Sequence, residues 1–223
     1  PEVVDEVYRQ LADTFRGLPI TYIKWDHNRS MSEVFSAGGD REYQGTVRHR
    51  FILGMYSLYA KMMAAFPGIL FESCASGGAR FDPGMLYYAP QAWCSDNTDA
   101  IERIRIQYGT SLVYPLSSIG SHVSAVPNEQ IKRITPLRTR AAVAYFGTFG
   151  YEQDLTKAGE EELEEMKLQI SFMKKYRSLI QKGTFCRLIS PFEKDGNIAA
   201  WEVISEDGKE VLAAYFRILQ KPE

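Results

Sequence analysis

The segment YIKWDHN (residues 22–28) brings a lysine and an aspartate out of a short apolar run. Side chains alternate between the two faces of a strand, so Lys24 and Asp26 share one face, and Ile23 and Trp25 share the other. If the strand lies in a barrel, Lys24 and Asp26 lie at its mouth, where the ammonium keeps the carboxylate ionised and ready to act as nucleophile or base. A simple salt bridge near a strand end explains the pair equally well.

Helix and strand patterns alternate on both sides of this segment. We expect helices at residues 4–15, 46–66, 99–109, 129–145 and 159–180, and strands at 20–24, 69–72, 91–95, 114–120 and 147–153. This alternation is typical of a parallel sheet covered by helices, either doubly wound or closed as a (β/α) barrel. Periodicity does not separate the two, but polar sets at three strand ends favour the barrel, because barrel chemistry gathers where strands end and loops begin.

The pattern changes beyond Gly183. The segments CRLIS, IAAWEVIS and EVLAAYF alternate with the period of strands, and a turn signal, EDG, separates the last two. We therefore predict two domains: residues 1–182 belong to the α/β part, and residues 183–223 begin an all-β part.

Composition limits the possible functions. The chain has 223 residues, of which 45% are hydrophobic and 24% charged, so it can bury a substantial core. A formal net charge of −2 gives no electrostatic reason to expect nucleic acid or an anionic membrane as a partner. No apolar stretch approaches the roughly 18 residues of a membrane span. We expect neither nucleic acid nor membrane binding.

Cysteine usage bears on the compartment. Three cysteines leave one over and show no metal-type spacing, so we expect free thiols in a reducing compartment, the cytoplasm. The chain opens inside a predicted helix without an initiator methionine, and we expect it to be a piece of something longer.

A second polar set, SDNTD, holds two aspartates. Asp99 precedes AIE in the capping register, with Glu102 placed for a capping box, so we expect it to cap a helix. Asp96 has no such task and follows Trp93, whose ring could desolvate a carboxyl group and keep it protonated as a general acid. Alone in a loop, an aspartate is more often a turn former. Paired with Asp26 across a barrel mouth, Asp96 is better explained as an acid.

The third set, ESCASGG, surrounds Cys74. A catalytic thiol needs a histidine base, and no histidine of the chain has a diagnostic spacing, so we interpret Cys74 as the wall of a pocket. Gly77 and Gly78 allow backbone to approach a ligand closely, but they are too few and misplaced for a phosphate loop.

These sets, in their order along the chain, resemble the α-galactosidases of glycoside hydrolase family 36, which have a KWD strand, then a C-x-SGG loop, then an SD-N strand. The long motifs FESCASGGARFDPGMLYY and WCSDNTDAIERIRIQYGTSLVYPLSSIGSH make the resemblance specific. It implies that Asp26 is the nucleophile and Asp96 the acid/base. The galactose subsite would be lined by Lys24, Asn28, Cys74 and Gly77. His27 and Cys94 stand where many members have Met and Thr, so the resemblance carries over the chemistry but not the fine substrate preference.

The resemblance also implies a fold and a reaction. The fold would be a partial (β/α)₈ TIM barrel, strands 4 to 8 of the family barrel, followed by the start of a C-terminal β-sandwich. The reaction would be retaining hydrolysis of terminal α-galactosides of the melibiose and raffinose type, by double displacement on two aspartates. The mechanism needs no metal and no organic cofactor. Trp25 and Trp93 could offer faces for a sugar, although Trp25 is better placed for the core.

Two other classes stay open. A galactosyl transferase would use the same two aspartates with a different acceptor, whereas a non-catalytic sugar-binding or structural fragment would lack the acid. Because a closed barrel needs eight strands and we expect five before Gly159, the isolated chain should be poorly active or inactive. Open sheet edges favour self-association, and we expect a homo-oligomer in the full-length protein.

Overall fold

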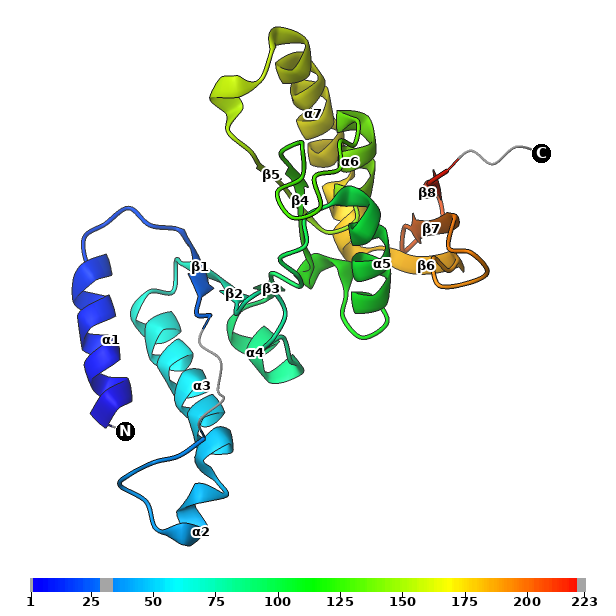
Figure 1. Ribbon diagram of the computed structural model, residues 1–223. Coiled ribbons are helices and arrows are strands. Elements are labelled where there is room, and N and C mark those ends of the chain that lie inside the picture. The colour runs from blue at the N-terminus through cyan, green and yellow to red at the C-terminus, as the bar shows by residue number, and fades with distance from the viewer. Residues whose placement is uncertain (1, 29–33, 220–223) are drawn as a thin grey trace. The chain divides into compact units, whose positions relative to one another are not determined.

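The computed structural model describes residues 2–28 and 34–219 (Figure 1). The chain divides into two compact units, Pro1–Ala92 and Trp93–Glu223. Parallel strands connected through helices occur in both units, and the second unit ends in an antiparallel sheet. The predicted α/β class with a trailing β part is therefore confirmed.

The first unit is built around a parallel sheet. Its elements are α1 (Glu2–Phe15), β1 (Tyr22–Asp26), α2 (Arg41–Gln44), α3 (Val47–Ala65), β2 (Leu70–Cys74), α4 (Pro83–Tyr88) and β3 (Gln91–Ala92). The strand order is β1-β2-β3, and the register sets Lys24 beside Glu72 and Asp26 beside Cys74. Because these strands are parallel, the residues after Asp26 and after Cys74 emerge at the same edge of the sheet.

The core of the first unit lies between β1, β2 and the helices α1 and α3. Tyr59 and Met62 of α3 are fully buried, and Phe71 of β2 is 1% exposed. The Trp25 ring lies 4.6 Å from the Tyr59 ring and 6.1 Å from the Phe71 ring, between centroids. Trp25 thus packs in the core, as the period of two predicts, and leaves Asp26 on the opposite face of the strand.

The second unit combines a parallel pair of strands with an antiparallel sheet. Its elements are α5 (Ala100–Thr110), η1 (Leu116–Ser118), β4 (Gly120–Ser124), α6 (Leu137–Ala144), β5 (Thr148–Glu152), η2 (Leu155–Lys157), α7 (Glu160–Lys182), β6 (Thr184–Ile189), β7 (Ile198–Ile204) and β8 (Val211–Arg217). β4 and β5 are parallel, and β6-β7-β8 is antiparallel. Trp201 of β7 is buried in one cluster with Ile104 of α5 and Ile180 of α7. The antiparallel sheet therefore shares a core with these helices.

Two predicted strands differ in the structure. The strand expected at 114–120 begins only at Gly120, because Pro115 has no N–H to give to a sheet and its carbonyl instead accepts from the backbone and the hydroxyl of Ser118. The strand expected at 91–95 pairs over Gln91–Ala92 alone. In the part of the chain that the structure describes, five strands do precede Gly159, but β4 shares only Gly120 with the strand expected at 114–120, where Leu116–Ser118 form a 3-10 turn.

The helix expected at 129–145 is also shorter and covers Leu137–Ala144. Pro136 stands directly before its first turn. In the preceding loop, the Asn128 Oδ1 atom accepts from the backbone N–H groups of Gln130 and Ile131, so a side chain holds those donors in a turn. The rest of the loop is irregular and includes Lys132 with a φ of 61°.

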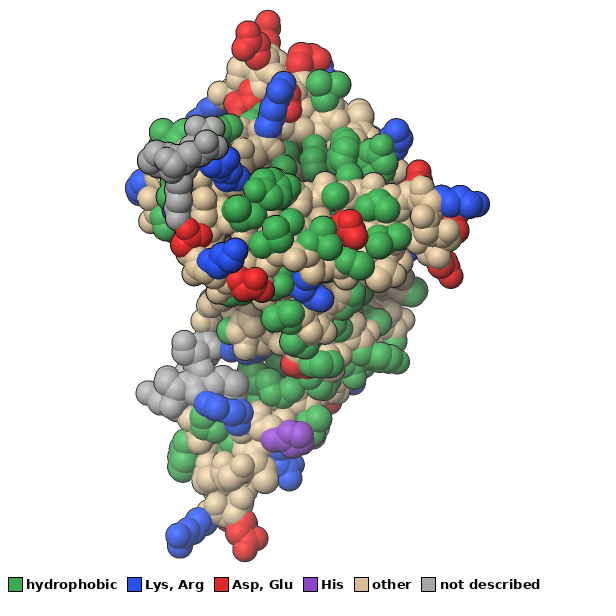
Figure 2. Space-filling view, turned by 90° about the vertical axis from the view of Figure 1, so that its right-hand side faces the viewer, with side chains coloured by type: hydrophobic (Ala, Val, Ile, Leu, Met, Phe, Trp, Pro, Cys, Tyr) green, Lys and Arg blue, Asp and Glu red, His purple; other side chains and the backbone are tan. Residues whose placement is uncertain are grey.

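The surface shows charges of both signs. Figure 2 shows Lys and Arg side chains interspersed with Asp and Glu, and hydrophobic side chains gathered between them. This mixture agrees with the small net charge of the sequence. Across residues 2–28 and 34–219, no helix has the length and apolar character needed to span a bilayer.

Candidate active site

Asp26 ends β1 on the polar side of the strand. Its Oδ2 atom accepts a hydrogen bond of 3.1 Å from Asn28 Nδ2, and its carboxylate also accepts from the Cys74 thiol on the neighbouring strand. Desolvation is the largest single influence and tends to raise the pKa of Asp26. The two hydrogen bonds, from Cys74 and then Asn28, together with the charge of Lys24, outweigh it and lower that pKa below its ordinary value. Asp26 is therefore held as an anion.

This geometry changes the expected reason for the ionisation of Asp26. The sequence suggested that the Lys24 ammonium is the main cause, but Cys74 and Asn28 contribute more. The Lys24 Nζ atom lies 3.9 Å from Glu72 Oε1 on the adjacent strand. Lys24 thus pairs with Glu72, and its charge is the third influence, after Cys74 and Asn28, that lowers the pKa of Asp26.

Glu72, which the sequence did not single out, is a buried carboxylate beside Lys24. Its side chain is 1% exposed, and besides Lys24 it is contacted by Gln91, whose Nε2 atom donates to Glu72 Oε2 over 2.7 Å. A buried carboxylate costs stability unless it is paired and hydrogen-bonded. The available signal was a charged residue inside the otherwise apolar strand ILFE.

The loop after β2 is fastened to Asn28. The backbone N–H of Ser76 donates to Asn28 Oδ1 over 2.7 Å, and the N–H of Ala75 donates to the carbonyl of Gly77 over 3.0 Å. Gly77 has a φ of 75°, a region that residues with a Cβ rarely adopt, and so needs to be glycine. Asn28 thus joins the carboxylate of Asp26 to the glycine loop.

Cys74 is a poor candidate for a nucleophile. Its side chain is buried, and burial together with the hydrogen bond that it gives to Asp26 raises the pKa of the thiol to about 11. At neutral pH the group is a thiol and not the thiolate that nucleophilic catalysis requires. This favours the interpretation of Cys74 as a pocket wall.

His27 is a poor candidate for a catalytic base. Burial, and next the charge of Arg80, lower the pKa of His27, which keeps the imidazole neutral. Neither ring nitrogen has a hydrogen-bond partner within the described part of the chain. Arg80 Nη1 donates to the His27 carbonyl over 2.6 Å. The segment after Asp26 is therefore anchored by its backbone and not through its imidazole.

Asp96 lies in the segment between β3 and α5 and is exposed, in contrast to the desolvation expected next to Trp93. Its backbone carbonyl accepts a hydrogen bond of 2.7 Å from Gln130 Nε2, and the N–H of the next residue, Asn97, donates to Ser95 Oγ over 3.1 Å. The first contact joins residues 34 apart in the sequence, whereas the second is a local turn in which a serine hydroxyl accepts from the backbone two residues on. The peptide that follows Asp96 is therefore held at both of its polar groups.

Asp99 caps α5 as predicted. Its Oδ2 atom accepts from the N–H groups of Ile101 and Glu102, over 3.0 and 3.1 Å, and it pairs with Arg133. The expected capping box is not formed as such, because the N–H of Asp99 donates to Asn97 Oδ1 and Glu102 pairs with Arg133 at 3.7 Å. Asp99 is thus occupied by structural contacts.

Trp93 is not available as a stacking platform. The Trp93 ring lies 4.6 Å from the His122 ring, between centroids, and the Arg103 guanidinium lies 4.8 Å from the Trp93 centroid. Both tryptophans considered for sugar contact, Trp25 and Trp93, are packed against protein groups.

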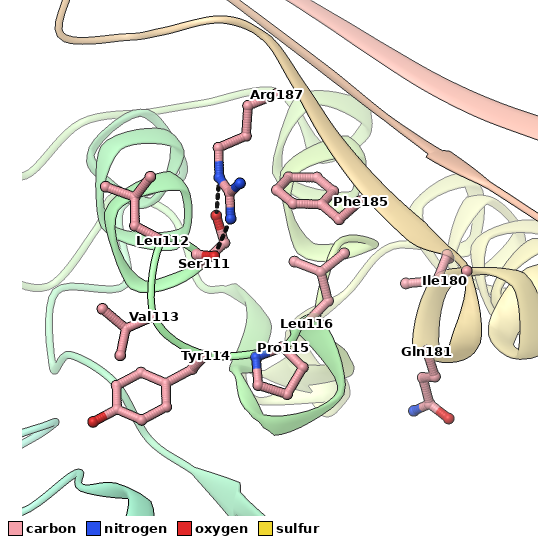
Figure 3. A pocket seen from close by; sticks show the side chains of 11 residues that line it. Ser111, Leu112, Val113, Tyr114, Pro115, Leu116, Ile180, Gln181, Phe185 and Arg187 are labelled. Atoms are coloured by element: carbon pink, nitrogen blue, oxygen red, sulfur yellow. Dashed lines mark hydrogen bonds between the residues drawn. The ribbon is translucent and has the colours of Figure 1, made fainter.

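A separate hollow lies elsewhere in the second unit. Figure 3 shows its lining, which comes from residues 111–116, 180–181, 183, 185 and 187 and includes none of the predicted site residues. Its only arginine, Arg187, already donates to the hydroxyl and carbonyl of Ser111. Two of the donors of Arg187 are therefore already used within the protein. Among the described residues, no group of three or more His, Cys, Asp or Glu side chains could hold a metal ion.

Comparison with known proteins identifies the family. The melibiase family model matches residues 1–183. Alpha-galactosidase AgaA of Geobacillus stearothermophilus is 54% identical over 218 residues, which are 98% of this chain and 30% of that protein. Mel36A of Lactobacillus acidophilus is 46% identical over 98% of this chain and 29% of its own length.

Solved structures agree. A GH36 alpha-galactosidase AgaA variant in complex with raffinose matches with a TM-score of 0.95 and 52% identity, over 99% of this chain and 30% of that one. The alpha-galactosidase from Lactobacillus brevis matches with a TM-score of 0.97 over all of this chain and 30% of its own. The chain thus spans less than a third of these relatives. It belongs to the melibiase family and resembles its GH36 alpha-galactosidases throughout its length.

Proposed function

We propose that the protein to which this chain belongs hydrolyses terminal α-galactosides of the melibiose and raffinose type, with retention of configuration. The observation that carries the proposal is Asp26, an anionic carboxylate at the C-terminal end of a parallel strand, held by Asn28 and Cys74. The substrate class is supported by AgaA, whose variants were crystallised with raffinose and with stachyose.

In the first step, Asp26 attacks the anomeric carbon of the galactose. The bond from that carbon to the glycosidic oxygen breaks while Asp96 gives its proton to the oxygen, and a galactosyl ester forms on Asp26. An ionised Asp26 suits this task because the attacking carboxylate needs no deprotonation first.

In the second step, water hydrolyses the ester. Asp96, now ionised, takes a proton from the water as its oxygen attacks the anomeric carbon, and Asp26 leaves as the free carboxylate. Two displacements at one carbon restore the original configuration. Two carboxyl groups suffice for this chemistry, and the mechanism uses no metal or organic cofactor.

The galactose subsite in this proposal is lined by Lys24, Asn28, Cys74 and Gly77. Asn28 and Cys74 both contact the Asp26 carboxylate, and Gly77 shapes the loop that Asn28 fastens. Lys24 lies on the same face of β1 as Asp26. These contacts support a common location for the four residues.

The full fold is part of the same proposal. We place β1 to β5 as strands 4 to 8 of a (β/α)₈ barrel, and β6 to β8 as the start of a C-terminal β-sandwich. Because the relatives are more than three times as long, we expect the 223-residue chain alone to be poorly active. The full-length protein is proposed to be a homo-oligomer. The three free cysteines of this chain support a cytoplasmic location.

The deciding experiment compares two substrates on the purified full-length protein. Hydrolysis of 4-nitrophenyl α-galactoside should exceed that of 4-nitrophenyl α-glucoside by a large factor, and raffinose should release galactose. Equal or greater activity on the glucoside, or none on the galactoside, would overturn the proposal. Incubation with sucrose as an acceptor distinguishes the transferase, which would yield a galactosylated sucrose in place of free galactose.

The stereochemistry gives a second, independent test. The first sugar product seen by NMR should be the α-anomer, and a crystal structure of the full-length protein should show the Asp26 and Asp96 carboxyl groups about 5–5.5 Å apart. A β-anomer with a separation of roughly 6.5–9.5 Å would indicate inversion instead.

A further inference from the structure

The loop between β4 and α6, residues 125–136, reaches back to the segment that contains Asp96. Three side chains from the end of β4 and from this loop contact Thr98 or Asp99. Ser124 Oγ donates to the Thr98 carbonyl over 2.9 Å, and Asn128 Nδ2 donates to Thr98 Oγ1 over 3.0 Å. Arg133 pairs with Asp99. The segment 96–99 is thus tied to this loop at several points along its length.

Gln130 makes the contact nearest to the proposed acid/base. Its Nε2 atom donates to the Asp96 carbonyl over 2.7 Å, and its own backbone N–H is held by Asn128 Oδ1 over 3.1 Å. Asn128 is 2% exposed, so the backbone of Gln130 is attached to a buried side chain. Gln130 itself is exposed, so its contact with Asp96 adds little to the core.

The geometry has a mechanical consequence for Asp96. A peptide group is planar, so fixing its carbonyl and its N–H fixes the orientation of the whole plane. Gln130 holds the carbonyl, and Ser95 Oγ holds the N–H of Asn97. The Cα atom of Asp96 lies in this same plane and is held with it. The backbone on the other side of Asp96 follows the buried Trp93, so rotation about the Cα–C bond of Asp96, and with it the direction of the Cα–Cβ bond, is restricted from both sides.

We propose that Gln130 is a positioning residue for proton transfer by Asp96. This inference rests on the proposed function, since it assigns a task within the same reaction. Gln130 does not touch the substrate in this scheme. It keeps the carboxyl group of Asp96 aimed at the glycosidic oxygen by locking the peptide that follows it.

The test uses the full-length protein with Gln130→Met, which preserves side-chain length and removes the donor. Glu129→Gln, at an exposed position in the same loop, is the matched control. Each variant is assayed on raffinose, whose sucrose leaving group needs a proton, and on 4-nitrophenyl α-galactoside, whose leaving group does not. Loss of one neutral hydrogen bond should lower kcat/KM for raffinose by about fivefold in Gln130→Met and change the aryl value less than about twofold.

A second variant sharpens the test. Ser95→Ala frees the other end of the same peptide plane, so it should show the same dependence on leaving group. Its effect and that of Gln130→Met should combine less than additively, since both act on one peptide. The thermal unfolding midpoint of Gln130→Met should stay within about 4 °C of the parent.

Each outcome decides something. A parent that hydrolyses neither galactoside overturns the proposed function and this inference together. An active parent in which Gln130→Met loses both activities equally, or loses neither, overturns the inference alone. A raffinose-selective loss in Glu129→Gln would also overturn it, because the effect would then belong to the loop in general.

Discussion

The two proposed catalytic carboxylates are held in opposite ways. Asp26 is held through its carboxylate, which accepts hydrogen bonds from Asn28 and Cys74, and these hydrogen bonds lower its pKa. Asp96 is held through its backbone, because Gln130 and Ser95 bind the two polar groups of the peptide that follows it. Within residues 2–28 and 34–219, the hydrogen bonds found for Asp96 do not involve its carboxyl group.

This difference matches the two tasks. A nucleophile must be ionised whenever substrate arrives, so donors on its oxygens help it. An acid/base residue must both lose and regain a proton in each cycle, and strong donors on its carboxyl group would hold it in the ionised state. Holding the peptide that follows Asp96 restricts where its carboxyl group can reach, and these contacts act on the backbone and not on the carboxyl oxygens.

The largest expected effect concerns the nucleophile. In the full-length protein, Asp26→Gly should lower kcat by about 10⁴-fold or more on every galactoside, because no ester can form. Azide should partly restore turnover of an aryl galactoside by filling the space and supplying an anion, and the product should be a galactosyl azide. The release of nitrophenol and the identity of that product are the measurements. Loss without any azide effect would argue against a nucleophilic Asp26.

The acid/base residue should give a selective loss. Asp96→Ala should lower kcat/KM for raffinose by about 10²–10⁴-fold, since general acid catalysis of sucrose departure disappears. The first step with 4-nitrophenyl α-galactoside should be far less affected, because nitrophenolate leaves without a proton. An equal loss on both substrates would remove the contrast between the two aspartates.

The third prediction concerns pH. Asn28→Ala removes one of the donors that depress the pKa of Asp26, so that pKa should rise toward the ordinary aspartate value of about 3.9. A depressed pKa keeps the carboxylate ionised to lower pH, and its rise moves the acidic limb of kcat/KM to higher pH. At neutral pH the lost charge-assisted bond should cost about tenfold in kcat/KM. An acidic limb that does not move would show that Asn28 serves only the loop at Ser76.

The sequence predicts the regular elements well where a pattern repeats over several turns. The long helices expected at 46–66 and 159–180 appear as α3 and α7, because each segment is long enough for helical spacing to emerge. The errors have local chemical causes. Pro115 removes a donor from the expected fourth strand, and Asn128 captures backbone N–H groups where a helix was expected to start.

In the candidate site, too, the sequence points to some residues and not to others. Lys24, Asp26 and Asp96 could be picked out because polar residues at strand ends are conspicuous in one sequence. The groups that hold them could not, since Gln130 meets Asp96 from 34 residues away and Ser76 meets Asn28 from 48. Such contacts depend on how strands and loops are placed, which no local pattern contains.

The smallest expected effect tests why Cys74 is a cysteine. In Cys74→Ser the hydroxyl can donate to Asp26 as the thiol does, so kcat/KM at neutral pH should fall by less than about threefold, the scale of a modest change in one hydrogen bond. Cys74→Ala removes the donor and should move the acidic limb upward, as Asn28→Ala does, because the thiol bond also lowers the pKa of Asp26. Since the pKa of the thiol is about 11, iodoacetamide should react with it slowly near pH 7. If Cys74→Ser instead lost activity on the scale of Asp26→Gly, Cys74 would have a chemical role of its own, and Asp26 would no longer be sufficient as the anionic centre of the site.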